Sequence, residues 1–335
     1  MQSMIKRSKI FWLRNRCSAC YSVAGLSYLM LSGKVSCFTS VLNNEHSSSI
    51  FKNGDELLYL PDGISLWFDI SLAEGRCVGV VNTNEKEIFP VNDRNELGAK
   101  EDDAEKKEND CWVYNFFHPS EISYAIKATN HNRNSFWLGR LAIRIALNFP
   151  NYPILKDRYG RPLLKNNNIN SNTSNIFGSI SHKKDRGVAL ISDNINNGDN
   201  LDFILAGVGI DLESTSRPGK MNISKRILTT KEQQSLGNLP GLSVEEEILL
   251  RFSLKEAIYK AAHPLLCQYV GFREAEVTPF ADGSASCTWL LDTNADKKIA
   301  KMTAHWKTVL DGDYFLTSAS VYKRAHTSHA AHDII

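Results

Sequence analysis

The chain has 335 residues, of which 42% are hydrophobic and 23% are charged, and its formal net charge is +2. A chain of this length and composition can bury a sizeable core, in one large domain or in two modest ones. The small net charge, the scattered basic residues and the lack of helix-turn-helix or zinc-finger spacing argue against a nucleic-acid partner. No stretch reaches the ~20 apolar residues of a transmembrane helix. Seven cysteines at scattered positions favour reduced thiols over a disulfide framework.

The N-terminal residues differ in composition from the rest of the chain. Basic residues and serines are frequent before Glu45, which is the first acidic residue. This composition is typical of an organellar transit peptide. A secretory signal is the competing interpretation, because an apolar run from Tyr21 to Leu31 follows the basic start, and a disordered extension or a mis-assigned start codon would need no signal at all. We expect residues 1–54 to be an extension of a mitochondrial or plastid protein, with a cytoplasmic location as the alternative.

The first half of the remaining chain is predicted to combine strands with one long helix. Apolar runs predict strands over Ile64–Leu72 and Cys77–Val81, and a helix is expected over 120–149. A hairpin is expected over 176–192, with its turn at Lys183–Asp185.

The second half is predicted to repeat strands followed by helices. A strand over 206–213 precedes helices that end at His263, because a residue before proline disfavours the helical conformation. Two hairpins follow, with turns at Asp282–Gly283 and Asp311–Gly312. This order of elements predicts an α+β fold.

The predicted strand over 206–213 carries two acidic residues on one face. Asp211 and Glu213 are two residues apart, so their side chains point the same way and their like charges need a compensating cation or proton. Gly207 and Gly209 share this face and are expected to leave space for a ligand beside the acids. Carboxylates, a phosphate oxygen and waters form the ligand set that Mg²⁺ prefers.

The helix before Pro264 carries a second polar group of residues. Ser243 and Glu246 fit a capping box at its start, and Glu256 and Lys260, four residues apart, project from one face. Taken singly, an Asp-x-Glu strand is more often a solvated edge, and a Glu–Lys pair is more often surface decoration. The two motifs together favour a divalent metal that holds a phosphate-rich ligand.

At these residues the chain resembles the 4′-phosphopantetheinyl transferase superfamily. The family signature is a hydrophobic-Gly-hydrophobic-Asp-x-Glu strand, followed by an aromatic-Ser-x-Lys-Glu-Ala/Ser-x-x-Lys helix. The matching segments here are Val208–Glu213 and Phe252–Lys260. Upstream, Gly178–His182 resembles the family's Gly-Ser-Ile-Ser/Thr-His segment, and Gly160–Pro162 resembles its Gly-Lys/Arg-Pro turn. Trp137–Leu147 resembles the Gly-Arg-x-Ala helix of the branch typified by enterobactin synthetase component D.

The resemblance implies the activity of a holo-[acyl-carrier-protein] synthase. In this reaction a serine of an apo carrier protein attacks the β-phosphate of coenzyme A in the presence of Mg²⁺. The 4′-phosphopantetheine arm is transferred to the serine, and 3′,5′-ADP leaves. Asp211, Glu213 and Glu256 would ligate the metal. Glu256, Lys260 and His182 would be the catalytic residues, with Glu256 as the base, acting directly or through a metal-bound water.

The resemblance also implies which residues face the phosphates of coenzyme A. Lys260 and Lys255 would face the pyrophosphate, although Lys255 has the alternative of a purely solubilising role. Ser181 and His182 would donate hydrogen bonds to phosphate oxygens. Glu232 lies where some members of the family place a further acid.

The far end of the coenzyme is expected to meet two arginines. Arg140 and Arg161 would hold the 3′-phosphate and the adenine, since a planar guanidinium suits a phosphate. Arg144 lies one helical turn from Arg140 and has the alternative of a surface position. The segment Asn130–Ser135 holds fewer basic residues than close relatives carry, which favours, as the alternative function, a coenzyme A- and carrier-binding module with impaired catalysis.

The family implies two similar α/β halves, a pseudo-dimer in one chain, with the active-site cleft between them. We place the N-terminal half at residues 55–202, the C-terminal half at 203–325 and a tail at 326–335, and we expect a monomer. A phosphate-loop enzyme is disfavoured, because no Gly-x-x-x-x-Gly-Lys-Ser/Thr segment is present. The carrier protein stays open, and with it siderophore or peptide, polyketide and fatty-acid biosynthesis.

Overall fold

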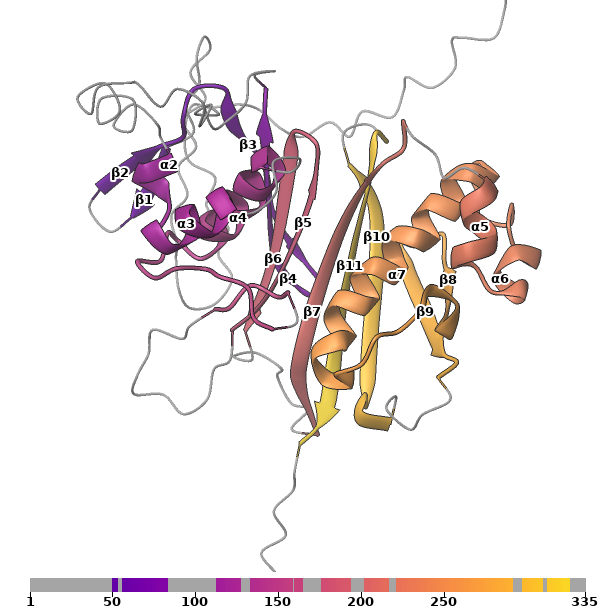
Figure 1. The fold of residues 1–335 in the computed structure, drawn as a ribbon. Coiled ribbons are helices and arrows are strands. Elements are labelled where there is room, and N and C mark those ends of the chain that lie inside the picture. The colour runs from indigo at the N-terminus through magenta and orange to yellow at the C-terminus, as the bar shows by residue number, and fades with distance from the viewer. Residues whose placement is uncertain are drawn as a thin grey trace, which may run out of the picture. The chain divides into compact units, whose positions relative to one another are not determined.

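The computed structural model describes residues 50–53, 56–83, 113–127, 133–158, 160–164, 176–193, 202–216, 221–291, 297–309 and 312–325. All of these ranges belong to one compact unit, residues 42–335. Within them the chain forms antiparallel sheets of two, four and five strands with few helices (Figure 1), which confirms the α+β class. Most of the expected extension and the expected tail lie outside the described residues.

The four-stranded sheet forms from the strands that the first half was predicted to contain. Its order is β3-β4-β6-β5. The turn between its last two strands contains Lys184 at φ 49°, as the predicted hairpin requires. A separate pair of strands precedes this sheet. The strands are β1 (Ile50–Asn53), β2 (Glu56–Tyr59), β3 (Ile64–Leu72), β4 (Gly75–Asn82), β5 (Ile176–Lys183) and β6 (Arg186–Asp193).

The region predicted as one helix over 120–149 forms separate helices. These are α2 (Val113–Phe116), α3 (Pro119–Lys127) and α4 (Arg133–Ala146), and residues 128–132 lie outside the described residues. The predicted end is wrong by three residues, because Asn148 and Phe149 have φ of 56° and 52°, which an α-helix cannot include. Helix α4 packs its buried apolar face on β4 and β6.

The five-stranded sheet has the order β7-β11-β10-β9-β8. Both predicted C-terminal hairpins are confirmed, with Gly283 and Gly312 at positive φ in their turns. The strands are β7 (Phe203–Ser214), β8 (Ala275–Pro279), β9 (Ser284–Trp289), β10 (Lys301–Val309) and β11 (Tyr314–Arg324).

Helix α7 (Val244–Leu266) covers one face of this sheet (Figure 1), and the short helices α5 (Met221–Ile227) and α6 (Thr230–Gln234) precede it. The capping box of Ser243 and Glu246 at its start is confirmed. The helix continues past the predicted end at His263 and through Pro264. Pro264 cannot donate a hydrogen bond to the carbonyl of Lys260, and the helix ends two residues later. Cys267, in the left-handed conformation, closes the helix by donating its backbone N–H to His263 O at 2.8 Å.

The two larger sheets pack against each other through the faces that α4 and α7 leave uncovered. Alternate residues of β4 and β6 face away from α4, and alternate residues of β7 face away from α7. They form one apolar cluster, whose fully or nearly fully buried members are Cys77, Val188, Leu190, Leu205, Val208, Ile210, Leu212 and Leu316. Strands β5 and β7 run side by side at the edge of this contact. The acidic face of β7 therefore turns toward α7 and the end of β5.

Candidate functional site

Strand β7 carries its acidic pair on the face that α7 covers. Gly207 and Gly209 lie on the same face, where we expected them to leave space for a ligand. This expectation is wrong. A Cβ at Gly209 would lie 1.9 Å from the carbonyl oxygen of Ala257, and one at Gly207 would lie 2.3 Å from that of Ala261. The glycines therefore allow the backbone of α7 to approach β7, which brings the helix residues to the acids.

Asp211 is the centre of the polar contacts between the two motifs. Its Oδ1 accepts hydrogen bonds from Ser181 Oγ and Lys260 Nζ, both at 2.8 Å, and its Oδ2 accepts one from Ser253 Oγ at 2.9 Å. Lys260 Nζ also donates to the carbonyl of Ile210 at 2.9 Å. The hydroxyl of Ser181, predicted to donate to a coenzyme phosphate, donates to Asp211 instead. Ser253 belongs to the helix motif, but sequence reasoning assigned it no role.

Glu213 is paired with a lysine that sequence reasoning missed. Its carboxylate accepts a hydrogen bond from Lys183 at the end of β5. Burial raises the pKa of Glu213, with Lys183 opposing the shift and the Asp211 carboxylate adding to it. A signal existed in the sequence, since Ser181 and Lys183 are spaced by two, as are the acids. Two strands lying side by side match such residues pair by pair.

Glu256 differs from the other two acids, because it forms no hydrogen bond or ion pair with any described residue. It is half-buried, and burial raises the pKa of its carboxyl group. Lys260 opposes this shift and Asp211 adds to it, so both lie within electrostatic reach of Glu256. The structure thus places a carboxylate that is unpaired among the described residues within electrostatic reach of Asp211 and Lys260.

A cavity of about 260 Å³ lies beside these residues. Helix α4, strand β5, the segment 156–162 and helix α7 contribute to its wall. Its cationic and imidazole side chains are Arg140, Lys156, Arg161, His182, Lys260 and His263, and its other lining residues include Phe136, Ser179, Ile180 and Tyr259. None of the described residues that line the cavity is acidic, so the cavity suits an anionic ligand.

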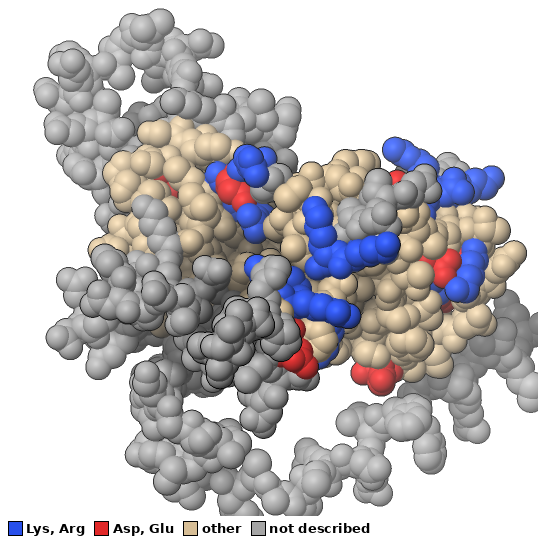
Figure 2. Space-filling model, turned by 90° about the horizontal axis from the view of Figure 1, so that it is seen from below, with Lys and Arg blue, Asp and Glu red and all other residues tan. Residues whose placement is uncertain are grey.

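Basic side chains are prominent on one face of the described part of the chain (Figure 2). On the face drawn in Figure 2, Lys and Arg side chains stand in several groups, with few Asp and Glu between them.

Arg140 reaches the cavity wall from α4 without a hydrogen-bond partner. It is only 4% exposed, its Nη1 has no partner among the described residues, and its guanidinium lies 5.2 Å from the centre of the Phe136 ring. Burial lowers the pKa of Arg140 to about 10, with Glu121 opposing the shift. A buried donor without an acceptor is costly, so its position indicates an anionic partner. Arg144, one turn later, is buried and paired with Glu121, so its alternative of a surface position is wrong.

Arg161 and His182 also lie on the cavity wall. Arg161 is held by Asp157, whose Oδ2 accepts from its Nε at 2.7 Å. His182 has one side open to solvent, yet the surrounding protein atoms lower the pKa of its imidazole, and Lys260 lowers it further. The ring is therefore neutral at physiological pH and offers one N–H donor.

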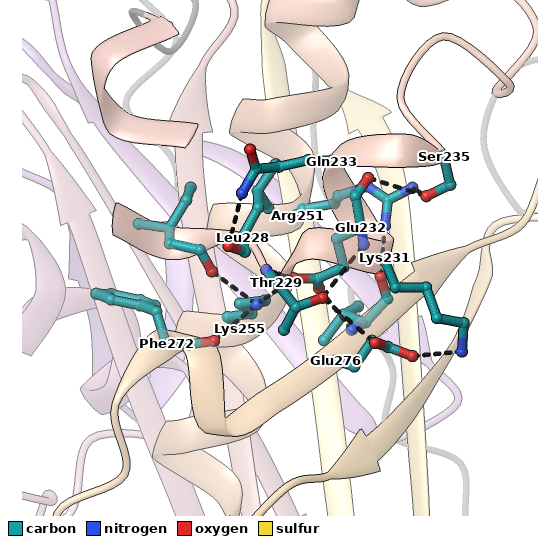
Figure 3. Close-up of polar contacts among 12 residues, drawn as sticks. Leu228, Thr229, Lys231, Glu232, Gln233, Ser235, Arg251, Lys255, Phe272 and Glu276 are labelled. Carbon is teal, nitrogen blue, oxygen red and sulfur yellow. Dashed lines mark hydrogen bonds and ion pairs between the residues drawn. The ribbon is translucent and has the colours of Figure 1, made fainter. Parts of the chain in front are cut away.

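Lys255 does not face this cavity, which corrects the expectation that it binds the pyrophosphate. It is 3% exposed, and its ammonium group donates to Ile227 O at 2.8 Å, Glu232 Oε2 at 2.7 Å and Phe272 O at 2.7 Å (Figure 3). All three donors of the ammonium group are used, and the alternative of a solubilising surface residue is wrong as well. Glu232 is buried in the same contact and is far from solvent.

A second, smaller pocket of about 130 Å³ shares Tyr259 with the first cavity. Lys255 and Glu256 are on its wall, although the three donors of the Lys255 ammonium group are used within the protein. Most of the other lining residues are apolar or aromatic, among them Ile258, Tyr269, Val270, Phe272 and Trp289. Tyr269 is 77% exposed and lies edge-on to Tyr259 with ring centres 6.3 Å apart. Tyr259 therefore stands between the cationic cavity and an apolar pocket whose wall includes Glu256.

The described residues contain no group of three or more His, Cys, Asp or Glu side chains arranged to hold a metal ion. The predicted set of Asp211, Glu213 and Glu256 is not gathered into one cluster, and Glu213 is engaged by Lys183. Asp211 still has an open acceptor position on Oδ2, since a carboxylate has about four lone-pair sites and three are used. In the described part of the chain no helix is long and apolar enough to cross a membrane.

The acidic motif of β7 and the Glu256–Lys260 motif of α7 fall in one stretch of the chain. Residues 207–317 match the family model of the 4′-phosphopantetheinyl transferase superfamily. This part of the chain is similar to the members of that superfamily. The match includes Asp211, Glu213, Glu256 and Lys260, and it confirms the resemblance inferred from the motifs. The narrower resemblance to the enterobactin synthetase component D branch stays a prediction.

The curated relative and the solved structures that resemble the chain have related names. A "Holo-[acyl-carrier-protein] synthase" of Lactobacillus johnsonii is 38% identical over 78 residues, which are 22% of this chain and 66% of that protein, just under two thirds of its length. The Chronobacterium ammoniagenes "ACPS-CoA complex" is 22% identical and covers 35% of this chain and 97% of its own, with a TM-score of 0.27. A holo-(acyl-carrier-protein) synthase of Bacillus anthracis in complex with CoA (3′,5′-ADP) is 23% identical and covers 36% and 97%, with a TM-score of 0.28.

Proposed function

We propose that this protein transfers the 4′-phosphopantetheine arm of coenzyme A to a serine of an apo carrier protein, with Mg²⁺, and releases 3′,5′-ADP. The observation that carries the proposal is that the superfamily match over residues 207–317 contains Asp211 and Glu256, which lie beside a cation-lined cavity. A superfamily transferase needs such a cavity for the phosphates of its coenzyme. Residues 55–202 and 203–325 act as the two halves of this transferase in our proposal, and the cavity receives residues from both.

The nucleotide end of coenzyme A fits the cationic cavity. Arg140 Nη1 has no partner within the described part of the chain, and Arg161 is fixed by Asp157. Both offer guanidinium donors that suit a phosphate. His182 and Lys260 lie on the same wall and would meet the pyrophosphate. The elongated, mainly uncharged arm then extends past Tyr259 into the apolar pocket. This arrangement brings the β-phosphate to Tyr259, next to which Glu256 lines the apolar pocket.

Asp211 and Glu256 would hold Mg²⁺ in this proposal. Asp211 has one open lone-pair position on Oδ2, and Glu256 is unpaired within the described residues, so the two supply the one or two carboxylates that Mg²⁺ takes beside phosphates and waters. Glu213 would join them only if it left Lys183. When bound, Mg²⁺ neutralises charge on the pyrophosphate as the leaving group departs.

The chain's own residues would perform the remaining steps. Glu256 takes the proton of the carrier serine as its oxygen bonds to the β-phosphorus, and the bond from that phosphorus to the oxygen of 3′,5′-ADP breaks. Lys260 keeps its position by donating to Asp211 and stabilises negative charge on the departing phosphate.

A transfer assay tests this function. Purified protein is incubated with coenzyme A, Mg²⁺ and a panel of apo carrier proteins for fatty-acid, polyketide and peptide synthesis, and intact mass is measured. We expect at least one carrier to gain a phosphopantetheine group, and no gain on any of them would refute the proposal. Glu256→Gln should slow transfer about 100-fold or more, since general-base catalysis supplies that much. Glu245→Gln is the matched control, because Glu245 is exposed in the first turn of the same helix.

Two finer parts of the proposal have their own tests. A chelator should abolish transfer and added Mg²⁺ should restore it, while Asp211→Asn should raise the Mg²⁺ concentration needed for half-maximal rate. An organellar location is tested by comparing fluorescent fusions of the full chain and of a chain that starts after residue 54. Equal distribution of the two fusions would contradict a role of residues 1–54 in targeting.

A further inference from the structure

We infer that Lys255 and Glu232 are positioning residues that set the orientation of Glu256. The inference rests on the proposed function, in which Glu256 is the base. It differs from the expectation that Lys255 binds the pyrophosphate, and it gives a role to a buried ion pair that the transfer chemistry does not use.

The ion pair joins three segments that precede and follow α7. Lys255 Nζ donates to Ile227 O at the end of α5, to Glu232 Oε2 in α6 and to Phe272 O after α7. Glu232 also accepts from Thr229 N and from Val277 N of β8, both at 2.7 Å (Figure 3). Every donor of Lys255 and both oxygens of Glu232 are therefore engaged, so the geometry of this junction is fixed by directional bonds.

The position of Glu256 depends on this junction. Glu256 follows Lys255 directly, about 100° around the helix. It forms no polar contact of its own with the described residues, so only the placement of the α7 backbone holds it on the wall of the second pocket. On the other side of the helix, Ser253 and Lys260 bond to Asp211 of β7. The turn that carries Glu256 is thus fixed from two sides, and removal of the Lys255 junction frees one of them.

Stability alone is a weak reason to keep such a pair. A buried ion pair loses most of its Coulombic gain to desolvation, and burial lowers the pKa of Lys255 although Glu232 opposes that shift. Apolar residues of similar volume often stabilise a fold equally well. They provide no directional bonds, however, so they cannot fix the rotation of α7 in the same way.

Three variants of the full-length protein separate positioning from binding and from stability. Lys255→Met leaves Glu232 charged and buried, and Lys255→Met/Glu232→Gln removes both charges. Arg251→Met is the matched control, because Arg251 is also buried on α7 and bonds to Glu247, Val277 O and Ser235 Oγ, but lies more than one helical turn from Glu256. For each protein we would measure Tm, the dissociation constant for coenzyme A, and kcat with a carrier protein that the unchanged protein modifies.

We expect Lys255→Met to bind coenzyme A as the unchanged protein does, while kcat falls about 100-fold, as a small misplacement of a reacting group can cause. The double variant should regain Tm relative to Lys255→Met and keep the low kcat. Arg251→Met should lose Tm and keep kcat. Coenzyme A binding weakened about tenfold or more by Lys255→Met, as the loss of a charged hydrogen bond would cause, would overturn the inference. Recovery of kcat together with Tm in the double variant would overturn it as well. If the unchanged protein modified no carrier, the proposed function would be refuted. This result is obtained before the variants are measured, so it is distinguishable from a failure of the inference about Lys255.

Discussion

Replacing Gly209 by alanine tests whether the glycines beside Asp211 serve the helix or a ligand. The added Cβ would lie 1.9 Å from Ala257 O, 2.8 Å from Ala261 N and 2.9 Å from Ala257 C. All three are backbone atoms of α7, which cannot rotate away as a side chain can. The helix and β7 must therefore separate by more than an ångström, or the variant cannot fold as the unchanged protein does.

The expected cost follows from this geometry. Overpacking a well-packed contact costs about 1–3 kcal/mol, and a backbone clash belongs at the upper end of this range. The separation also stretches the bonds from Ser253 and Lys260 to Asp211, and bonds to charged groups contribute about 1.5–3 kcal/mol each. We expect Gly209→Ala to lower the free energy of unfolding by about 3 kcal/mol or more.

Urea denaturation followed by tryptophan fluorescence measures this loss. Gly271→Ala is the matched control, because its added Cβ would come no closer than 3.4 Å to a flexible side chain, that of Glu274. This control should change stability by less than about 0.5 kcal/mol. If Gly209→Ala kept its stability and lost only coenzyme A binding, the glycine would serve a ligand after all, and our account of the contact between β7 and α7 would be wrong.

Two further predictions concern the coenzyme and the start of α7. Arg140→Met should weaken coenzyme A binding about 10- to 100-fold, since it removes a charged hydrogen-bond donor. Titration calorimetry should show no such change for dephospho-coenzyme A, which lacks the 3′-phosphate. Equal weakening for both ligands would place Arg140 elsewhere on the coenzyme. Ser243→Ala should cost about 1 kcal/mol in urea denaturation, because it removes the helix cap that bonds to Glu246 N. Hydrogen bonds from Ser243 lower the pKa of Glu246, so the carboxylate's contribution is present above the ordinary pKa of 4.5 and is lost as the pH falls below it; a cost of Ser243→Ala that stayed the same at acidic pH would contradict this.

Local sequence patterns predicted the elements that carry the site. The period-two alternation around Asp211 and the capping box of Ser243 with Glu246 depend on neighbours in the chain, and both elements are present as predicted. Errors occurred where a distant contact or a backbone irregularity decided the outcome. The α4 end is one case, since Asn148 and Phe149 leave the helical region, and the continuation of α7 through Pro264 is another.

The motifs could be recognised from the sequence, whereas the roles of single charged residues depended on the fold. Lys255 and Lys260 are five residues apart on one helix and carry the same charge. The fold buries Lys255 against Glu232 and turns Lys260 toward Asp211 and the cavity. A motif shows that a lysine is present, whereas its acceptors come from segments far away in the sequence, so proximity in space is not visible in the spacing.

The sequence by itself determined the family signature, the α+β class and the acidic strand and helix, because these follow from residue type and short-range periodicity. Only the tertiary structure decided that Gly207 and Gly209 make room for α7, that Lys183 pairs with Glu213, and that Glu256 is left without a partner among the described residues. Each of these three features depends on which segments of the backbone lie next to each other. That approach is set by the packing of two sheets and their helices, and a single strand or helix contains no information about it.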